Sequence, residues 1–311
     1  MISFRYHLVS LIAVLLALTV GIVVGTAVLN GPMLADLRGQ VTALSGDRAS
    51  VRAANGDLRR ELGRRDEFAA RVADAAVTGR LADTSVVLVS AANVSAGLTA
   101  AVRAVLVQAG ATVTGDIQLL PGYSDPARSA ELRAYVTSDS LPAGLQLPES
   151  GDASVLGSAL LSDVLVSRES TTPSAKDVTQ VVAGLASLRM LRVTGPEVAA
   201  ADYAVLITAG HPTGASAAGQ VTALTDLASA LDGAGRGAVV VGDRASADRT
   251  GVLGVIRTDR ALSASVSTVD SVTGAAGRVA TVYALVEQGA GKAGQYGVAP
   301  NAGSAMPGPG R

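Results

Sequence analysis

The chain has 311 residues, which by length alone is room for about two ordinary domains. Its 25 basic and 26 acidic side chains give a net charge of −1, which argues against a nucleic-acid-binding protein because such proteins carry a basic surplus. The absence of cysteine excludes disulfides, zinc–thiolate sites and lipidated cysteine anchors. Two histidines and four methionines leave few ligands for a transition-metal site.

An uncharged apolar segment occupies residues 8–29. A helix of this length reaches about 33 Å, enough to cross a hydrocarbon core of about 30 Å. We therefore expect a transmembrane helix over 8–29. Arg5 and His7 precede it, and the charges that follow it nearly cancel. The positive-inside rule then predicts that residues 1–7 are cytoplasmic and that the bulk of the chain is extracytoplasmic.

Two features of this segment allow an alternative. Gly25-Thr26-Ala27 offers the small residues of a signal-peptide cleavage site, but the apolar stretch is longer than the usual ~7 to 15 residues, which favours a retained anchor. Gly21 and Gly25 form a G-x-x-x-G pair of the kind that lets two membrane helices approach closely, although glycine is also simply common in such helices.

A heptad pattern predicts a coiled-coil stalk over residues 32–74, after an interruption expected at Asn30-Gly31-Pro32. Most of the seam positions are apolar, and Asn55 lies at a central a position, where an amide favours a parallel two-stranded pairing. The stalk predicts a homodimer. The alternative is a single amphipathic helix that packs on the downstream domain. With Leu34 at position a, the a and d positions are Leu34, Leu37, Val41, Leu44, Arg48, Val51, Asn55, Leu58, Leu62, Arg65, Ala69 and Val72.

Residues 82–289 are predicted to form an α/β domain. Continuous apolar runs, typical of strands buried on both faces, alternate with segments of helical periodicity. This alternation predicts a mainly parallel sheet with helices on both faces. The predicted strands are 85–89, 111–119, 203–208 and 238–241, and the predicted helices are 96–109, 126–138, 156–165, 175–189 and 215–231. The glycine- and proline-rich residues 290–311 are expected to be a disordered tail.

One loop is placed where parallel sheets bind ligands. Gly210-His211-Pro212-Thr213-Gly214 follows a predicted strand and precedes a helix, and Asp243 follows the next predicted strand. The chain has no full dinucleotide fingerprint, P-loop lysine or G-x-S-x-G elbow, so we interpret the loop as a structural turn. We assign no catalytic or cofactor-binding residue and expect a protein that is not an enzyme.

No metal-ligand residues are assigned either. Met1, Met33, Met190 and Met306 are far apart in the sequence, and His7 is expected to be an interfacial residue at the membrane boundary. Copper is therefore expected at most as a transported or sensed ion, and no resident cofactor is expected.

Several segments resemble the MctB family of actinobacterial envelope proteins, described as mycobacterial copper transport protein B. They extend from the opening residues 1–11 to about residue 297, nearly the whole chain. The segments are 1–11, 21–25, 138–144, 159–162, 266–270, 277–279 and 295–297. None of them is a catalytic signature, so no functional residue is carried over.

The resemblance implies a part in copper homeostasis or efflux, attributed in that family to an outer-membrane channel. Related proteins are linked to cell separation together with a membrane partner. The residues themselves instead predict a single-pass protein of the cell membrane with no pore of its own, which would act as a scaffold or regulator of an envelope protein partner. An enzymatic head with a ligand at residues 210–214 is the third hypothesis.

Overall fold

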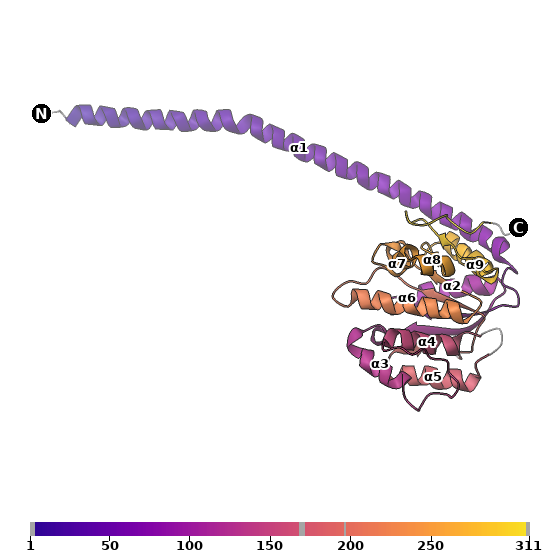
Figure 1. Ribbon diagram of the computed structural model, residues 1–311. Helices are drawn as coiled ribbons and strands as arrows, with labels where there is room; N and C mark the ends of the chain where they lie inside the picture. Colours follow the sequence, from indigo (N-terminus) through magenta and orange to yellow (C-terminus); the bar gives the residue numbers. More distant parts are fainter. Residues whose placement is uncertain (1–3, 168–171, 196, 309–311) are drawn as a thin grey trace. The chain divides into compact units, whose positions relative to one another are not determined.

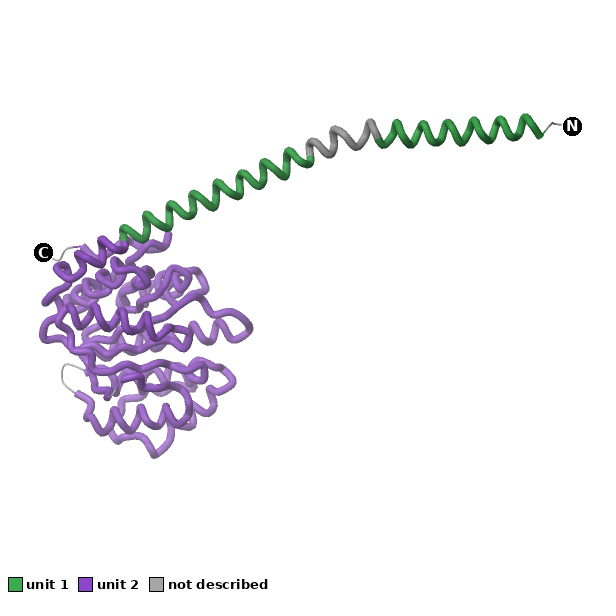
Figure 2. Tube along the Cα trace, turned by 180° about the vertical axis from the view of Figure 1, so that it is seen from behind, with its two compact units in different colours: residues 1–65 green, residues 66–311 purple. Residues whose placement is uncertain are grey.

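The computed structural model describes residues 4–167, 172–195 and 197–308, without the side chains of residues 27–36. The chain divides into two compact units, residues 1–65 and residues 66–311 (Figure 2). The first unit is helical throughout its described residues, and the second contains a single mixed sheet.

Unit 1 consists of most of helix α1, which covers Phe4–Val77. Its part Phe4–Thr26 is long and apolar enough to cross a membrane, which agrees with the predicted N-terminal apolar helix. The interruption predicted at Asn30-Gly31-Pro32 falls on residues 27–36, whose side chains lie outside the described part.

The described apolar side chains at heptad positions of unit 1 are exposed on the single chain. They are Leu37, Val41, Leu44, Val51, Leu58 and Leu62. A row of exposed apolar residues at this spacing leaves a seam available to a partner, but one chain does not test the coiled coil, which stays a prediction.

Unit 2 is built around a seven-stranded sheet of order β3-β2-β1-β4-β5-β6-β7, in which only β3 is antiparallel to its neighbour. β4 and β5 are buried along their whole length, as the continuous apolar runs predict for strands covered on both faces. The predicted mainly parallel α/β fold is therefore confirmed. The strands are β1 Ser85–Ser90, β2 Thr112–Leu119, β3 Leu191–Val193, β4 Tyr203–Ile207, β5 Ala238–Val241, β6 Ser267–Val269 and β7 Gln295–Tyr296.

In the described part of unit 2, eight further α-helices and three short 3-10 helices connect the strands. Within unit 2, α2 packs against α9, and α4 packs against both α6 and α3 (Figure 1). The α-helices are α2 Ala96–Gln108, α3 Ser129–Val136, α4 Ala153–Leu165, α5 Ala175–Ser187, α6 Ala217–Ala234, α7 Val252–Thr258, α8 Arg260–Ser265 and α9 Ala275–Gly289. The 3-10 helices are η1 Pro121–Tyr123, η2 Pro126–Arg128 and η3 Arg244–Ala247.

Local sequence explains where several of these helices begin. Ser95, Asp152 and Ser174 each precede a helix and accept a hydrogen bond from a backbone N–H of its first turn. Such N-caps satisfy donors that have no partner within the helix, and each contributes about 1 kcal/mol.

The last turns of α1 belong to unit 2, so the predicted stalk overlaps the head. Ala73 and Val77 are buried there, and the Tyr283 hydroxyl on α9 donates to the Ala76 carbonyl at 2.9 Å. The Asp66 carboxylate accepts a hydrogen bond from the Ala275 backbone N–H at 2.5 Å, at the start of α9. The negative charge lies at a helix N-terminus, where it is favourable. Residues 66–74 of the predicted stalk therefore belong to the same unit as the head.

The expectation of a disordered tail over 290–311 is wrong for residues 290–308. β7 pairs in parallel with β6, and Tyr296 forms a further bridge with Ser304. The glycine and proline content allowed sharp turns here, and side chains of the sheet hold the segment in place.

Candidate functional site

A crevice opens at the carboxyl ends of three neighbouring strands of unit 2. The chain enters the sheet at the inner strand β1, adds β2 on one side, and later returns to add β4 on the other side. This reversal is the topological switch point, where open parallel sheets place their ligands. The crevice has a volume of about 290 Å³. It is lined by residues 91–93 after β1, residues 119–121 and Ser124 at the end of β2, residues 208, 209 and 212 after β4, and Gln220 and Leu224 of α6.

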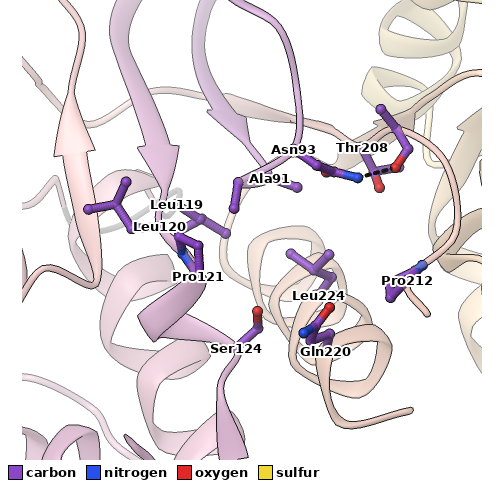
Figure 3. A pocket seen from close by; sticks show the side chains of 12 residues that line it. Ala91, Asn93, Leu119, Leu120, Pro121, Ser124, Thr208, Pro212, Gln220 and Leu224 are labelled. Carbon is purple, nitrogen blue, oxygen red and sulfur yellow. Dashed lines mark hydrogen bonds between the residues drawn. The ribbon is translucent and has the colours of Figure 1, made fainter. Parts of the chain in front are cut away.

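Four polar side chains border the crevice (Figure 3). Asn93 donates through Nδ2 to the Ala209 carbonyl at 2.5 Å, and Gln220 donates through Nε2 to the Ser216 hydroxyl at 3.1 Å. Thr208 is only 2% exposed, and its hydroxyl has no hydrogen-bond partner among the described residues. The Ser124 hydroxyl likewise has none within the described part of the chain.

The wall between these groups is apolar, and none of the described lining residues carries a charge. Leu119 and Leu120 contribute from the end of β2, Pro121 from η1, and Leu224 from α6. An apolar wall with a few uncharged polar groups is the usual composition of a small-molecule site, and it offers no acid, base or nucleophile pair for catalysis.

A second, more polar recess of about 220 Å³ lies beside the first and shares Ser124 with it. Tyr123 forms part of its lining, and the Tyr123 hydroxyl lies 3.2 Å from the Ser158 hydroxyl in the interior. Burial raises the pKa of Tyr123 far above its ordinary value, so this hydroxyl stays protonated and neutral.

The loop Gly210-His211-Pro212-Thr213-Gly214 lies at the rim of the crevice, where only Pro212 contributes to the lining. Gly210 and Gly214 have φ angles of +62° and +90°, the left-handed region that glycine adopts without steric cost. His211 points elsewhere, with its Nδ1 3.7 Å from the exposed Asp248 carboxylate. The sequence therefore located the sheet edge correctly, but most of the lining comes from other segments.

Asp243, the other candidate at this edge, has a structural task. One carboxylate oxygen accepts hydrogen bonds from the Gly210 and Ser246 backbone N–H groups, both at 2.9 Å. This carboxylate therefore fastens the loop after β4 to the start of η3. It does not line the crevice.

The residues considered for copper are not brought together in the described part of the chain. Met190 is fully buried in the core, Met306 is exposed, and His7 lies on the exposed apolar part of α1. Met1 and the Met33 side chain fall outside the described residues. Within the described ranges, no group of three or more His, Cys, Asp or Glu side chains could hold a metal ion.

Sequence reasoning missed a buried charged cluster near the C-terminus. Arg257 of α7 donates to the Asp270 carboxylate at 2.8 Å, to the Thr268 hydroxyl at 2.8 Å, and to the Tyr296 carbonyl at 2.7 Å. Asp270 also accepts a hydrogen bond from the Val298 backbone N–H at 2.7 Å. The cluster ties together the Ser-Thr-Val-Asp segment and the Gln-Tyr-Gly segment, two of the segments that carry the family resemblance. These two segments were the only sequence signal noted above that could have indicated the cluster.

A family model described as "Copper transport outer membrane protein, MctB" matches residues 1–307. The chain belongs to the MctB family. The protein named copper transporter MctB of Mycobacterium tuberculosis is 30% identical to it over 306 residues, and the match covers 96% of each chain. The copper transporter MctB of Mycobacterium leprae is 31% identical over 311 residues, again with 96% of each chain covered. The MctB match includes the apolar helix, the crevice and the C-terminal ion-pair cluster, which supports a copper-related role at the cell envelope.

Proposed function

We propose that this protein is a single-pass envelope protein with a part in copper homeostasis or efflux, and that its α/β head lies outside the cytoplasm. The observation that carries the copper role is the family match over residues 1–307, together with relatives that are named copper transporters. The anchoring is supported by the apolar helix Phe4–Thr26. In this proposal copper is a transported or sensed ion. On the same proposal the chain itself holds no resident cofactor and no catalytic centre.

The proposed orientation follows from charge at the two ends of the membrane helix. Arg5 precedes it, whereas Asp36 and Arg38 follow it and nearly cancel. Positive charge is retained on the cytoplasmic side, so this asymmetry favours a cytoplasmic N-terminus. A helix of this length also fits an anchor in the cell membrane rather than a location in the outer membrane.

We further propose that the protein is a parallel homodimer through the α1 seam. The support is the row of exposed apolar side chains at heptad spacing, from Leu37 to Leu62, and the polar Asn55 among them. From Asp66 onward α1 belongs to unit 2, where Ala73 and Val77, which are not a or d positions, are buried and the d-position Val72 stays exposed. The pairing is therefore proposed for the seam from Leu37 to Leu62. Tethering of two chains in one membrane raises their effective concentration and favours this weak seam.

A second candidate function is a scaffold or regulator of another envelope protein, with no pore of its own. The described residues contain one helix of membrane-spanning length, and the head is an open sheet covered by helices. On this proposal copper handling would depend on a partner that the exposed seam or the head positions at the membrane.

The test compares a deletion strain with strains that carry the full chain or a double variant Leu15→Arg, Leu16→Arg. The Leu15→Ile, Leu16→Ile variant is the matched control, because it keeps the helix apolar. The measurements are cellular copper content and growth in copper. We expect deletion to alter both, and the full chain and the isoleucine control, but not the arginine variant, to restore them. Unchanged copper content and tolerance after deletion would overturn the copper role.

Co-purification from membranes tests the scaffold role. This role is overturned if no partner protein is recovered and if the cell envelope and cell division stay intact in the deletion strain.

A further inference from the structure

The crevice at the switch point contains hydrogen-bonding groups that the protein leaves unused. Thr208 is only 2% exposed as a residue, and its hydroxyl has no hydrogen-bond partner among the described residues. Because Thr208 lines the crevice, this hydroxyl is left to water or to a ligand there. Its location at the carboxyl end of β4, next to β1, is where this class of sheet recognises ligands.

Further unused groups face the same space from other elements. Asn93 and Gln220 each use their amide N–H₂ in a contact with the protein, which leaves their side-chain carbonyl oxygens available as acceptors. These N–H contacts fix the orientation of both amides. The Ser124 hydroxyl borders the same crevice (Figure 3). The crevice thus has two oriented acceptors and two hydroxyls before any ligand arrives.

The lining also limits the chemistry of a ligand. No described lining residue is charged, so an ionic ligand would lose hydration without compensation. The volume of about 290 Å³ is at the small end for ligand sites. The apolar wall formed by Leu119, Pro121 and Leu224 needs an apolar group opposite it, and the polar groups need hydroxyl or amide hydrogens.

We propose that this crevice binds a small uncharged ligand with hydroxyl and amide groups, of the size and chemistry of a single acetamido sugar. The sugar hydroxyls and the amide N–H donate to the carbonyl oxygens of Asn93 and Gln220. The Thr208 and Ser124 hydroxyls accept from or donate to the sugar hydroxyls. The acetyl methyl group lies against the leucine and proline wall. This site is separate from any copper role and from the α1 seam.

The experiment uses the full chain in lipid nanodiscs, with N-acetylglucosamine as the probe and saturation-transfer NMR as the measurement. We expect binding, with the largest transfer to the acetyl methyl protons because they contact the apolar wall. Glucose 6-phosphate, which is charged, is expected not to bind. Absence of N-acetylglucosamine binding at millimolar concentration would overturn the proposal, and so would binding of adenosine in its place.

Substitutions of residues that line the crevice test whether N-acetylglucosamine binds there. Thr208→Val keeps the shape and removes the hydroxyl, so we expect about tenfold weaker binding, the effect of one lost hydrogen bond. Thr281→Val is the matched control, because Thr281 is also fully buried and its hydroxyl bonds within α9, away from the crevice. Gln220→Ala, at a half-buried position, provides a second test should Thr208→Val fail to fold. Unchanged affinity in a folded Thr208→Val or Gln220→Ala variant would contradict the site.

Discussion

The guanidinium of Arg257 and the carboxylate of Asp270 form an ion pair at 2.8 Å with side-chain exposures of 2% and 0%. The pair joins α7 to the end of β6, and both partners also bind the backbone of the C-terminal segment. Because the guanidinium and both carboxylate oxygens bind groups of the C-terminal segment, the cluster orders a segment whose composition alone suggests disorder.

Substitution of Asp270 tests how strongly this cluster holds the head together. Asp270→Asn removes one charge and leaves the Arg257 cation buried without compensation, which we expect to cost about 3–5 kcal/mol of unfolding free energy. The measurement is urea denaturation of the purified chain. The control is Glu67→Gln, which breaks an exposed ion pair with Arg71 and is expected to cost less than about 1 kcal/mol. Equal destabilisation by the two variants would refute the importance of the buried pair.

Gly297 tests the ordered path of the C-terminal segment. Its φ angle is +132°, and a Cβ built at this position would collide with the Asp270 carboxylate. We therefore expect Gly297→Ala to destabilise the head by about 2 kcal/mol or more, from backbone strain and overpacking together. A Cβ at Gly308 meets nothing within 4 Å, so Gly308→Ala is the control. The measurement is thermal unfolding of both variants. If Gly297→Ala is as stable as the native chain, this segment does not pack on Asp270.

Asp232 predicts a pH dependence of stability. Burial raises the pKa of Asp232 above its ordinary 3.8, although hydrogen bonds from the Ala238 N–H and from Ser265 oppose the shift. The folded state then binds the proton more tightly than the unfolded state, so this contribution to stability is complete below the ordinary pKa. It is lost as pH rises through the raised value.

Asp232→Asn should remove that dependence while keeping an acceptor for the Ala238 N–H. We expect the variant to gain stability relative to the native chain as pH increases from below 4 toward neutrality, measured as the difference in Tm. Asp139→Asn provides the control at an exposed site, and its difference should vary less with pH. A pH-independent difference for Asp232→Asn would show that the carboxyl is not perturbed by burial.

The proposed stalk dimer is open to site-specific crosslinking because the chain has no cysteine. Val51→Cys places one thiol at a d position, and oxidation should link two copies in the membrane. Adding Asn55→Asp should weaken the link, since two carboxylates would meet in the seam. Ser50→Asp, at an outward position of the same turn region, should leave the crosslink intact. Equal crosslinking in all three would contradict the parallel arrangement.

Long apolar runs made most of the head predictable. The strands β1, β4 and β5 are almost entirely Val, Leu, Ile, Ala and Tyr, and the periodic segments between them form helices close to the predicted ranges. β6 and β7 escaped because strands of three and two residues carry no period, and Ser267 and Thr268 are polar although buried. Their burial depends on partners from α9 and the C-terminal segment, which pattern alone does not reveal.

The sequence predicted the location of the crevice but not most of the residues that line it. A loop after a parallel strand indicated the right sheet edge at Gly210, but Asn93 and Ser124 reach it through the strand order, which follows from long-range pairing. In the same way, Asp243 has the appearance of a ligand-binding carboxylate in the sequence. Only its two backbone hydrogen bonds show that it has a structural role, because they join the loop after β4 to the start of η3.

The central claim is that the α1 helix holds the head on the outer side of the cell membrane. The most direct measurement labels single cysteines in intact cells with a membrane-impermeant maleimide, using Thr250→Cys on the exposed surface of the head and Ile2→Cys before the apolar helix. The account predicts that the full-length chain stays with the membranes, that Thr250→Cys reacts in intact cells, and that Ile2→Cys reacts only after lysis. The reverse labelling, or recovery of the intact chain free of membranes, would contradict it.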